Sequence, residues 1–274
     1  MYHLGLIGYP LRHSLSPEIH IAALKACGLE GDYSLFPVSP DDKQGLKSLL
    51  NRVRTGEITG LNVTIPHKQN VIPLLDELTP TAQAIGAVNT IYLRDNKLIG
   101  DNTDAPGFLT DLNKFLTTEN TEKNISALVI GAGGSARAVV YALVNNGWNV
   151  TIAARRIKQA KQLAASLTHH TIQLTNYQTL NVQRSTFNLL VNVTPLGMAP
   201  NADQSPWPEN LPFPNASVYD LVYNPRETKL VKDARAQGLS ATTGLGMLIE
   251  QAALAFELWT GQCPPREIMR ASVG

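Results

Sequence analysis

The amino-acid sequence predicts an α/β protein of two domains, the second built on a parallel β-sheet. Residues 127–138, ALVIGAGGSARA, join a short apolar strand to a glycine turn and then to a helix start. Strand-like and helix-like segments alternate on both sides of this motif, which favours parallel strands with right-handed crossovers. In a chain of 274 residues, a full domain's length precedes the glycine turn, so we expect the turn to open a second domain.

Residues 1–104 form the first predicted domain, an α/β lobe with its own core. Runs of branched and aromatic residues predict strands, and apolar residues at helical spacing predict helices. The strands are expected at 4–9, 33–38 and 60–65, and the helices at 18–28 and 45–53. Residues 87–100 predict two more strands around a turn at Asp95 and Asn96. A connecting helix follows, with one apolar face from Phe108 to Leu116, and the polar run 117–124 closes it.

Residues 105–245 form the second predicted domain. Its strands are expected at 127–130, 148–154, 187–193 and 217–223, and its helices from the glycine turn to about Asn146 and at 229–238. The proline-rich segment 194–215 is a long loop, and loops of this length are usually functional, an irregular surface excursion being the alternative. An apolar helix begins at Gly246, and its pattern alone allows it to pack on either domain.

Composition excludes several classes of partner. The formal net charge is +1, from 23 basic and 22 acidic residues without a long run of one sign, so nucleic acid and anionic membranes are poor candidates. The sequence has neither a long apolar span nor a signal-peptide pattern at its start, and we expect a cytoplasmic protein. Cys27 and Cys263 have no metal-like or redox-like spacing, and the histidines show no ligand pattern, so no metal site is expected.

The glycine motif has the G-x-G-x-x-G/A form of a dinucleotide-binding turn. Gly131 permits the tight turn, Gly133 lets the backbone approach the phosphates, and Ala136 keeps the helix close to the strand. The helix N-terminus supplies free N–H groups to the anion. The motif therefore predicts a Rossmann-type domain, with an incidental glycine turn as the alternative. The expected cofactor contacts are Gly131, Ala132, Gly133, Gly134, Ser135 and Ala136.

The end of the second strand of this domain indicates NADP. NAD-binding domains carry an Asp or Glu there for the ribose hydroxyls. This chain has Ala154, Arg155, Arg156 and Lys158 and no carboxylate. A guanidinium can hold a 2′-phosphate through two charge-assisted hydrogen bonds. The alternative is a solvated, basic helix face.

Three short motifs of the first domain carry polar side chains at helix starts or strand ends. Ser14 and Ser16 precede Pro17, which predicts Ser16 as an N-cap and leaves Ser14 free to receive a small carboxylate. Thr64 and Lys68 follow a buried strand, at the mouth where α/β sheets bind ligands. Thr103 and Asp104 lie at a helix entrance, where capping is the ordinary explanation.

Taken together, these motifs make the chain similar to the shikimate dehydrogenase family over nearly its whole length. The matching motifs are SLSP at 14–17, NVTIPHK at 62–68, GAVNT at 86–90, GDNTD at 100–104, GAGGSARA at 131–138, NVTPLGM at 192–198, DLVYNPRET at 220–228 and GLGMLIEQAA at 244–253. The resemblance implies a two-domain enzyme that reduces 3-dehydroshikimate to shikimate with NADPH, in the pathway to the aromatic amino acids. It also implies that residues 246–274 return to complete the substrate domain.

The resemblance assigns roles by motif match. Lys68 and Asp104 would form the catalytic pair, and Ser14 and Ser16 would hold the substrate carboxylate. The other substrate contacts would be Thr64, Asn89, Thr103, Tyr223 and Gln251, with Asp104 also on a ring hydroxyl. Further cofactor contacts would be Thr194, Gly197, Met198, Gly244 and Met247.

The chain also departs from the family pattern. Ala154 stands where an Asn is usual before the arginine, which softens the expected NADP preference, and Pro195 stands where a small hydroxyl residue is common. The chemistry itself needs a positioned acid for the alkoxide that develops as a ketone is reduced. A partly desolvated lysine suits that task, and a nearby carboxylate orients it. The alternatives are a quinate or dual quinate/shikimate dehydrogenase and, more remotely, a non-catalytic NADP-binding sensor. We expect a monomer or a homodimer.

Overall fold

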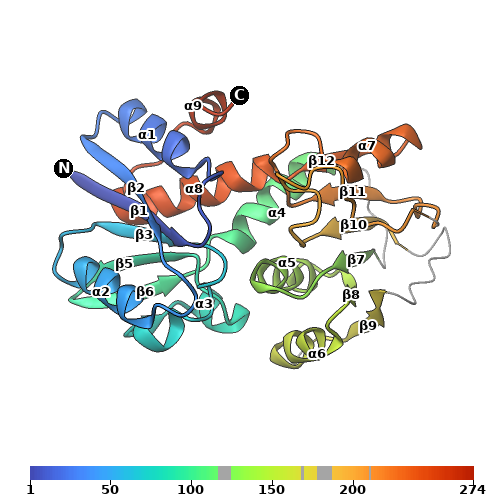
Figure 1. Cartoon of the computed structure of the whole chain (residues 1–274), viewed down its shortest axis with the longest axis horizontal. Coiled ribbons are helices and arrows are strands. Elements are labelled where there is room, and N and C mark those ends of the chain that lie inside the picture. Colours follow the sequence, from blue (N-terminus) through green and yellow to red (C-terminus); the bar gives the residue numbers. More distant parts are fainter. Residues whose placement is uncertain (117–124, 168–169, 178–186, 210) are drawn as a thin grey trace. The chain divides into compact units, whose positions relative to one another are not determined.

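The computed structural model describes residues 1–116, 125–167, 170–177, 187–209 and 211–274, and the chain forms two compact units (Figure 1). Unit 1 consists of Met1–Gly107 and Ile249–Gly274, and unit 2 of Phe108–Leu248. The division expected from the sequence is 1–104 with 246–274, and 105–245. The polar run 117–124 lies outside the described residues. In the part of the chain that is described, no helix has the length and apolar character needed to cross a membrane.

Unit 1 is built on a mixed sheet. Its strands lie in the order β2 (Gly31–Pro37), β1 (Tyr2–Gly8), β3 (Gly60–Val63), β5 (Thr90–Arg94), β6 (Lys97–Asp101) and β4 (Glu77–Leu78). The first three are parallel, β5 is antiparallel to both β3 and β6, and β4 is parallel to β6. The β5–β6 turn has positive φ at both Asp95 and Asn96, as a type I′ hairpin turn requires, and the predicted hairpin is confirmed.

Helices complete unit 1, and one face of the sheet packs into an apolar core. The helices are α1 (Ser16–Ala26), α2 (Lys43–Arg54), α3 (Pro80–Ile85), the single 3₁₀ turn Ile72–Leu74 and α9 (Arg266–Ala271). Leu46, Leu49, Leu50 and Val53 recur at helical spacing on α2 and are all buried against strand residues such as Leu61. That spacing is why the sequence predicts the helix.

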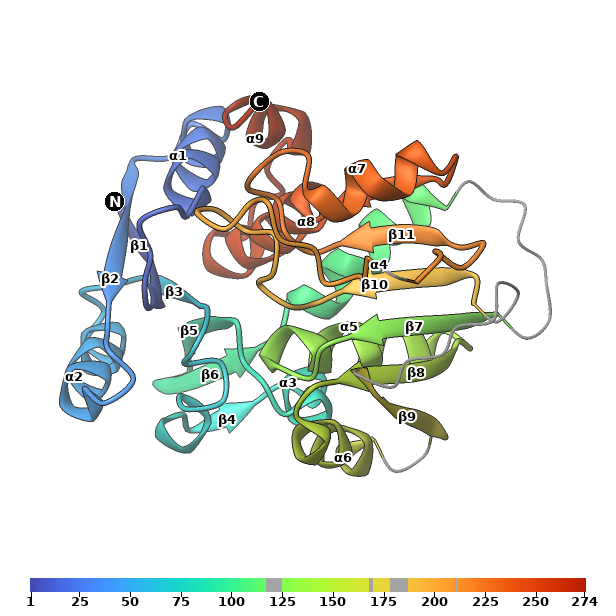
Figure 2. The same ribbon diagram turned by 45° about the vertical axis from the view of Figure 1, so that its right-hand side comes forward.

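Unit 2 has an all-parallel sheet, and the predicted fold class is confirmed. The order is β12 (Ala241–Thr243), β11 (Ser217–Asp220), β10 (Leu189–Asn192), β7 (Ser126–Ile130), β8 (Asn149–Ala154) and β9 (Ile172–Asn176). If the strands of this unit are numbered 1 to 6 in chain order, from β7 to β12, the order read from β9 is the doubly wound 3-2-1-4-5-6. Figure 2 shows β7, β10 and β11 running in the same direction. The chain reverses its winding between β7 and β10, and ligands of this fold bind at the carboxyl ends of those two strands.

The helices of unit 2 are α5 (Gly134–Asn145), α6 (Ile157–Ser166) and α7 (Lys229–Ala236). Two more helices, α4 (Asp104–Phe115) and α8 (Leu245–Thr260), each contain one boundary between the units. Within unit 1, Gly107 of α4 lies directly against α8, because a Cβ there would come within 2.8 Å of the backbone nitrogen of Gln251. A glycine at this position therefore sets how closely Gln251 approaches the start of α4.

Several short elements have no clear sequence signal. The sequence reading places no strand at β4, β9 or β12 and no helix at α3 or α9, and it considers a helix at α6 only as the alternative to a cofactor contact. β4 has two residues and β12 has three, too few to show an alternation of apolar and polar residues. The proline-rich loop is also partly structural. Trp207 and Phe213 stack with ring centroids 5.2 Å apart and lie in the core of unit 2.

Candidate active site

Lys68 and Asp104 form a buried ion pair in unit 1. The Lys68 Nζ lies 2.5 Å from Asp104 Oδ2, and the two side chains are only 10% and 7% exposed. Lys68 follows β3, and its carbonyl accepts a hydrogen bond from the Val88 N–H, which fixes the backbone below the ammonium. Motif order alone does not show that these residues meet. The structure brings them together across 36 positions of sequence.

Asn89 is the centre of the hydrogen-bond network around this pair. Its Nδ2 donates to Asp104 Oδ1 at 2.9 Å and to Gln251 Oε1 at 3.3 Å. Its Oδ1 accepts from the Thr103 N–H at 2.8 Å. The Asn89 backbone is held as well, since its N–H donates to Asp101 and its carbonyl accepts from Val63. Three expected substrate contacts, Asn89, Thr103 and Gln251, are therefore linked through Asn89, which itself binds the carboxylate of Asp104.

Asn102 caps helix α4, a role that the sequence reading gives by default to Thr103 or Asp104. The Oδ1 of Asn102 accepts from the backbone N–H of Asp104 at 3.1 Å and of Ala105 at 3.3 Å. Asp104 is the first residue of the helix, so its carboxylate is free to face Lys68. An Asn two positions before an Asp at a helix start is itself a capping signal. It would have indicated that Asn102 is the cap and that Asp104 is not.

Asn62 is a second polar residue of the site that sequence reasoning missed. It is buried at the end of β3, accepts from the Tyr33 hydroxyl at 2.9 Å and donates to the Asn89 carbonyl at 3.2 Å. The signal was present in the NVTIPHK motif, where the two-residue spacing of Asn62 and Thr64 places both side chains on the same face of an extended segment. Thr64 itself is half-buried just beyond that strand.

The expected capping role of Ser16 at the start of α1 is corrected by the structure. Ser16 is not the N-cap. Leu15 holds that position with helical dihedrals and no side-chain cap, and Ser16 is the first helical residue. The Ser14 hydroxyl accepts the Ser16 N–H at 3.3 Å, so it is Ser14 that supports the helix start. The reason is local, because the helical φ and ψ of Leu15 shift the helix start by one residue.

The glycine turn of unit 2 has the geometry of a phosphate-binding site. Gly131 has φ +118°, a conformation that favours glycine, and a Cβ there would come within 2.9 Å of Thr194 Cγ2. Gly133 precedes α5 with ordinary dihedrals and has open space where a Cβ would project. The N-cap residue of α5 is Gly133, which offers no side-chain acceptor to the first N–H groups of the helix. Ala136 is fully buried, as close packing of helix on strand requires.

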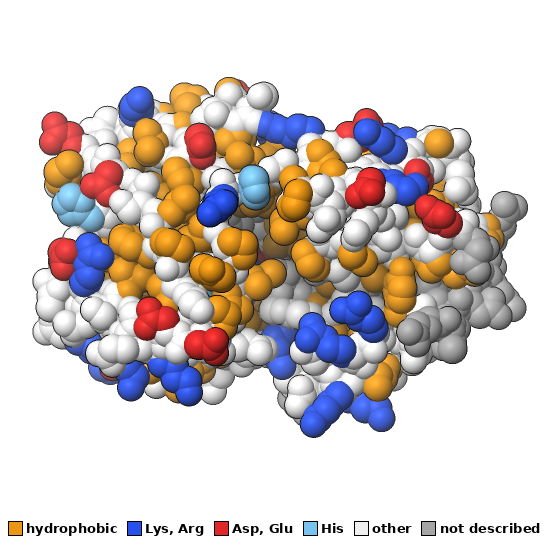
Figure 3. All heavy atoms as spheres, viewed as in Figure 1, with side chains coloured by type: hydrophobic (Ala, Val, Ile, Leu, Met, Phe, Trp, Pro, Cys, Tyr) orange, Lys and Arg blue, Asp and Glu red, His pale blue; other side chains and the backbone are white. Residues whose placement is uncertain are grey.

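A basic surface begins where β8 ends. Arg155, Arg156, Lys158 and Lys161 are all exposed, and no acidic residue occurs in the sequence between Glu122 and Asp203. Figure 3 shows the Lys and Arg side chains gathered over α6 without an acidic side chain among them on this face. Ala154 is buried at the end of the strand. The residues present therefore fit a bound anion such as a 2′-phosphate.

The segment after β10 lies beside the glycine turn. Thr194 is half-buried there, Met198 is exposed, and Gly197 has φ +88°, so a side chain at that position would be strained. The remaining expected contacts of unit 2 are spread over other loops: Tyr223 is half-buried after β11, and Gly244 and Met247 are buried around the start of α8. Burial raises the pKa of the Tyr223 phenol, which keeps it a hydrogen-bond donor at neutral pH.

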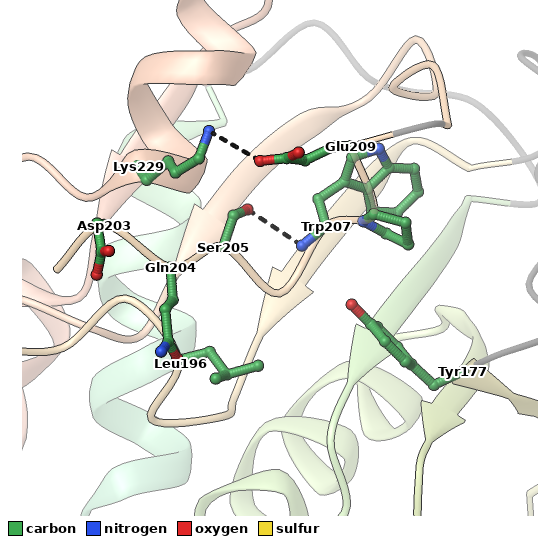
Figure 4. Close-up of a pocket in the computed structure, with 9 residues that line it drawn as sticks. Tyr177, Leu196, Asp203, Gln204, Ser205, Trp207, Glu209 and Lys229 are labelled. Carbon is green, nitrogen blue, oxygen red and sulfur yellow. Dashed lines mark hydrogen bonds and ion pairs between the residues drawn. The ribbon is translucent and has the colours of Figure 1, made fainter. Parts of the chain in front are cut away.

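A hollow of about 400 Å³ lies beyond this segment in unit 2 (Figure 4). It is bordered by Leu196, Tyr177, Trp207 and Lys229, among others. Two of its polar groups already have partners: the Tyr177 hydroxyl donates to the Pro206 carbonyl, and Lys229 pairs with Asp233 at 2.8 Å. We assign it no ligand. Among the described residues, no group of three or more His, Cys, Asp or Glu side chains could hold a metal ion.

Comparisons with known proteins find similarity along most of the chain. The family model of the shikimate dehydrogenase substrate-binding domain matches residues 6–91, that of shikimate / quinate 5-dehydrogenase matches 115–195, and that of the shikimate 5′-dehydrogenase C-terminal domain matches 244–273. The chain is 43% identical to the shikimate dehydrogenase (NADP(+)) of Salinibacter ruber over 269 residues, which cover 95% of this chain and 93% of the relative. The chain belongs to the shikimate dehydrogenase family. The family predicted from the motifs is confirmed.

Two solved structures show how far the likeness to the shikimate dehydrogenase family extends. The shikimate 5-dehydrogenase of Thermus thermophilus, solved with NADP(H) and shikimate, is 38% identical with a TM-score of 0.85, over 99% of this chain and 98% of that one. The quinate dehydrogenase of Corynebacterium glutamicum, solved with NAD, is 34% identical with a TM-score of 0.88, over 99% of this chain and 98% of that one. The fold is therefore shared by members with different substrates and cofactors.

Proposed function

We propose that this chain catalyses the reversible, NADPH-dependent reduction of 3-dehydroshikimate to shikimate, a step in the biosynthesis of the aromatic amino acids. The observation that carries the proposal is the buried Lys68–Asp104 pair, with Asn89 and Gln251 bonded around it, in a chain of this family. Unit 1 would bind the substrate and unit 2 the dinucleotide. We further propose a cytoplasmic enzyme that acts as a monomer or a homodimer.

Lys68 is the proposed proton donor. A bound nicotinamide supplies a hydride, and the ketone oxygen that gains negative charge needs a proton at the same time. The Lys68 ammonium carries that proton in a site almost shielded from water. Asp104 holds the ammonium at 2.5 Å and, through its other oxygen, the Asn89 amide at 2.9 Å. The carboxylate thus fixes the direction of the donor and can also accept a substrate hydroxyl.

The remaining polar groups of unit 1 suit a polyhydroxy acid. We assign the substrate carboxylate to the hydroxyls of Ser14 and Ser16, which lie at the start of α1. The ring hydroxyls go to Asn89, Asp104, Gln251 and Thr64, with Thr103 beside them. Fixed amides and hydroxyls select which carbonyl faces the hydride, which is how orientation contributes to rate. Tyr223 is proposed as a further substrate contact on its motif alone.

Unit 2 has the features that NADP needs. The uncapped start of α5 and the open space at Gly133 suit a pyrophosphate. Arg155, Arg156 and Lys158 suit the 2′-phosphate, since no carboxylate lies nearby in the sequence to repel it. The proposed contacts of the rest of the cofactor are Thr194, Gly197, Met198, Gly244 and Met247.

Quinate is the second candidate substrate, because a quinate dehydrogenase shares the fold at a TM-score of 0.88. Quinate carries the elements of water across the ring double bond of shikimate. We favour shikimate because serine stands at both Ser14 and Ser16 and because the cofactor end is basic.

The loss of NADPH absorbance separates these possibilities. Purified enzyme is mixed with NADPH and either 3-dehydroshikimate or 3-dehydroquinate. Turnover with 3-dehydroshikimate alone is the expected result, and comparable turnover with both would identify a dual enzyme. Tight NADPH binding without turnover of either substrate would instead identify a cofactor sensor and contradict the proposal.

A further inference from the structure

A second buried polar network lies in unit 2, at the carboxyl ends of β10 and β11. Asn192 ends β10 and Asp220 ends β11, while Thr228 is the N-cap of α7; all three are fully buried. The carboxylate of Asp220 accepts hydrogen bonds from the Thr228 hydroxyl at 2.6 Å, the Asn192 Nδ2 at 2.8 Å and the Val222 N–H at 3.1 Å. One carboxylate therefore joins three separate segments of the unit.

Asn192 passes this restraint to the next segment of chain. Its Oδ1 accepts from both the backbone N–H of Thr194 at 2.9 Å and the Thr194 hydroxyl at 2.7 Å. The same hydroxyl then accepts from the Leu196 N–H at 3.3 Å, and Asn192 Nδ2 reaches the Leu196 carbonyl at 3.5 Å. The turn 194–196 is thus folded around one amide side chain.

The carboxylate decides which way that amide points. An ionised carboxyl group only accepts hydrogen bonds, so Asn192 must present its NH₂ to Asp220 and its oxygen to Thr194. A rotated amide would set its NH₂ against the Thr194 N–H and its oxygen against the carboxylate. The hydrogen bonds of the Asn192 amide to Asp220 and to Thr194 would both be lost. A buried polar group without a partner costs free energy of folding.

The turn so held lies beside the glycine turn of the dinucleotide motif. The Thr194 Cγ2 would be 2.9 Å from a Cβ at Gly131, and the backbone N–H of Val193 donates to Ile130 at the end of β7. This is the switch point of the sheet, where ligands of the fold bind. A displacement of Thr194 would therefore change the wall of the expected cofactor site.

We propose that Asp220 is a positioning residue for the dinucleotide, because it fixes the Asn192 amide and through it the Thr194–Leu196 turn. The proposal rests on the proposed function, which places NADP in unit 2. It assigns to Asp220 and Asn192 a role in cofactor affinity without contact to the cofactor.

The test is direct titration of NADPH, followed by its fluorescence, into wild-type enzyme and Asp220→Asn. We expect about tenfold weaker binding in the variant, because an amide at 220 no longer dictates the orientation of Asn192. Val218→Ala is the matched control: it lies on the same strand and is fully buried but apolar, so it destabilises unit 2 without touching the network. The folded Val218→Ala protein should bind NADPH as the wild type does.

Acid provides an independent readout. Burial raises the pKa of Asp220 to about 6, against the opposing effect of its three hydrogen bonds. The charged groups of α7 do not contribute to this shift; Lys229 is paired with Asp233, and Arg235 with Glu227. The advantage of wild type over Asp220→Asn should therefore shrink as the pH falls below about 6. Comparing the two proteins cancels the titration of the 2′-phosphate, which has its own pKa near 6.

The outcomes are distinguishable. Equal NADPH affinity in wild type and Asp220→Asn, or an equal loss in Val218→Ala, would overturn the positioning role and leave the proposed function intact. No binding of NADPH to wild type would overturn the proposed function itself. Should Asp220→Asn not fold, Thr228→Val removes one of the same three donors from another element, and a weaker but measurable loss of NADPH affinity is expected.

Discussion

The two units both contain a buried polar network around a carboxylate, but the networks differ in charge. In unit 1, Asp104 faces the ammonium of Lys68 at 2.5 Å, with amide and hydroxyl groups around the pair. In unit 2, the described residues that donate to Asp220 are all neutral: Thr228, Asn192 and Val222. An ion pair contains a proton that can be transferred, whereas a lone carboxylate offers fixed acceptors. We therefore propose that the same residue type serves chemistry in one unit and architecture in the other.

The largest effect is expected on the ion pair. Lys68→Ala should lower kcat by about 10²- to 10⁴-fold, the usual worth of a general acid, while NADPH affinity stays nearly unchanged. Lys68→Met keeps the length of the side chain and should behave alike, and the exposed Lys47→Ala is the control. Steady-state kinetics with 3-dehydroshikimate measure the effect. A near-normal kcat in Lys68→Ala would mean that Lys68 is a structural residue. The polar networks of both units would then be structural.

A substitution of Asp104 tests whether this residue and Lys68 act as one catalytic unit. Asp104→Ala should lower kcat and raise KM together, because one carboxylate both orients Lys68 and faces the expected position of a ring hydroxyl. Groups that act as a unit are not additive, so the double variant with Lys68→Ala should be little slower than the worse single variant. If the two losses multiply instead, the residues act independently.

The next effect concerns the basic surface of unit 2. Arg155→Ala should weaken NADPH binding by about 10- to 150-fold, the worth of a charged hydrogen bond of about 1.5–3 kcal/mol, and leave NADH binding nearly unchanged. Lys232→Ala, exposed on α7, is the control. Titration of NADPH and NADH into each variant gives the ratio of the two dissociation constants. An equal loss for NADPH and NADH would show that Arg155 contacts a part that both share.

The pH dependence of stability tests the lone carboxylate. The folded pKa of Asp220, about 6, lies above its ordinary value of 3.8, so between about pH 4 and 6 the folded protein holds a proton that the unfolded chain has lost. Its contribution to the free energy of unfolding is therefore greatest below pH 4, falls as the pH rises to 6 and is constant above it. Denaturant unfolding should show wild type losing on the order of 2 kcal/mol relative to Asp220→Asn over that range. If wild type instead gained stability relative to Asp220→Asn as the pH rose, the folded protein would be stabilising the ionised carboxylate.

The smallest effect separates the two serines. Ser14→Ala should lower the free energy of unfolding by about 1 kcal/mol, since its hydroxyl accepts the Ser16 N–H, and should also raise the KM for shikimate. Ser16→Ala should raise KM with little change in stability, because no side-chain cap depends on it. Thermal denaturation and steady-state kinetics of both variants measure these effects. A loss of stability in Ser16→Ala but not in Ser14→Ala would show that Ser16 is the cap.

The sequence predicts the elements whose pattern is long and regular. The apolar spacing of α2, the β-turn-α motif around Gly131 and the positive-φ pair Asp95 and Asn96 all depend on local rules, and the structure has each of them. The helix start at Ser16 was misassigned, because it depends on the dihedrals of Leu15, which the sequence does not determine by itself.

The hydrogen-bond networks were largely beyond sequence reasoning. Asn192 and Asp220 meet because β10 and β11 are paired in register at their last residues, a tertiary fact. The bond between Asn89 and Gln251 spans 162 positions of sequence. Motif matching could name both residues, but only the folded chain shows that they share a hydrogen bond. Asn62 and Asn102 were missed because neither carries chemistry of its own, and each acts by holding a neighbour.

The position of Gln251 also sets an order of events during protein synthesis. The ribosome finishes unit 2 before it adds the segment Ile249–Gly274, which belongs to unit 1. Domains generally fold as units while the chain emerges, so the nucleotide unit can fold first and meet its cofactor early. The group around Asn89 stays incomplete until α8 is made and packs against Gly107. A prematurely terminated chain that ends at Leu248, the last residue of unit 2, should therefore bind NADPH but should not recognise shikimate.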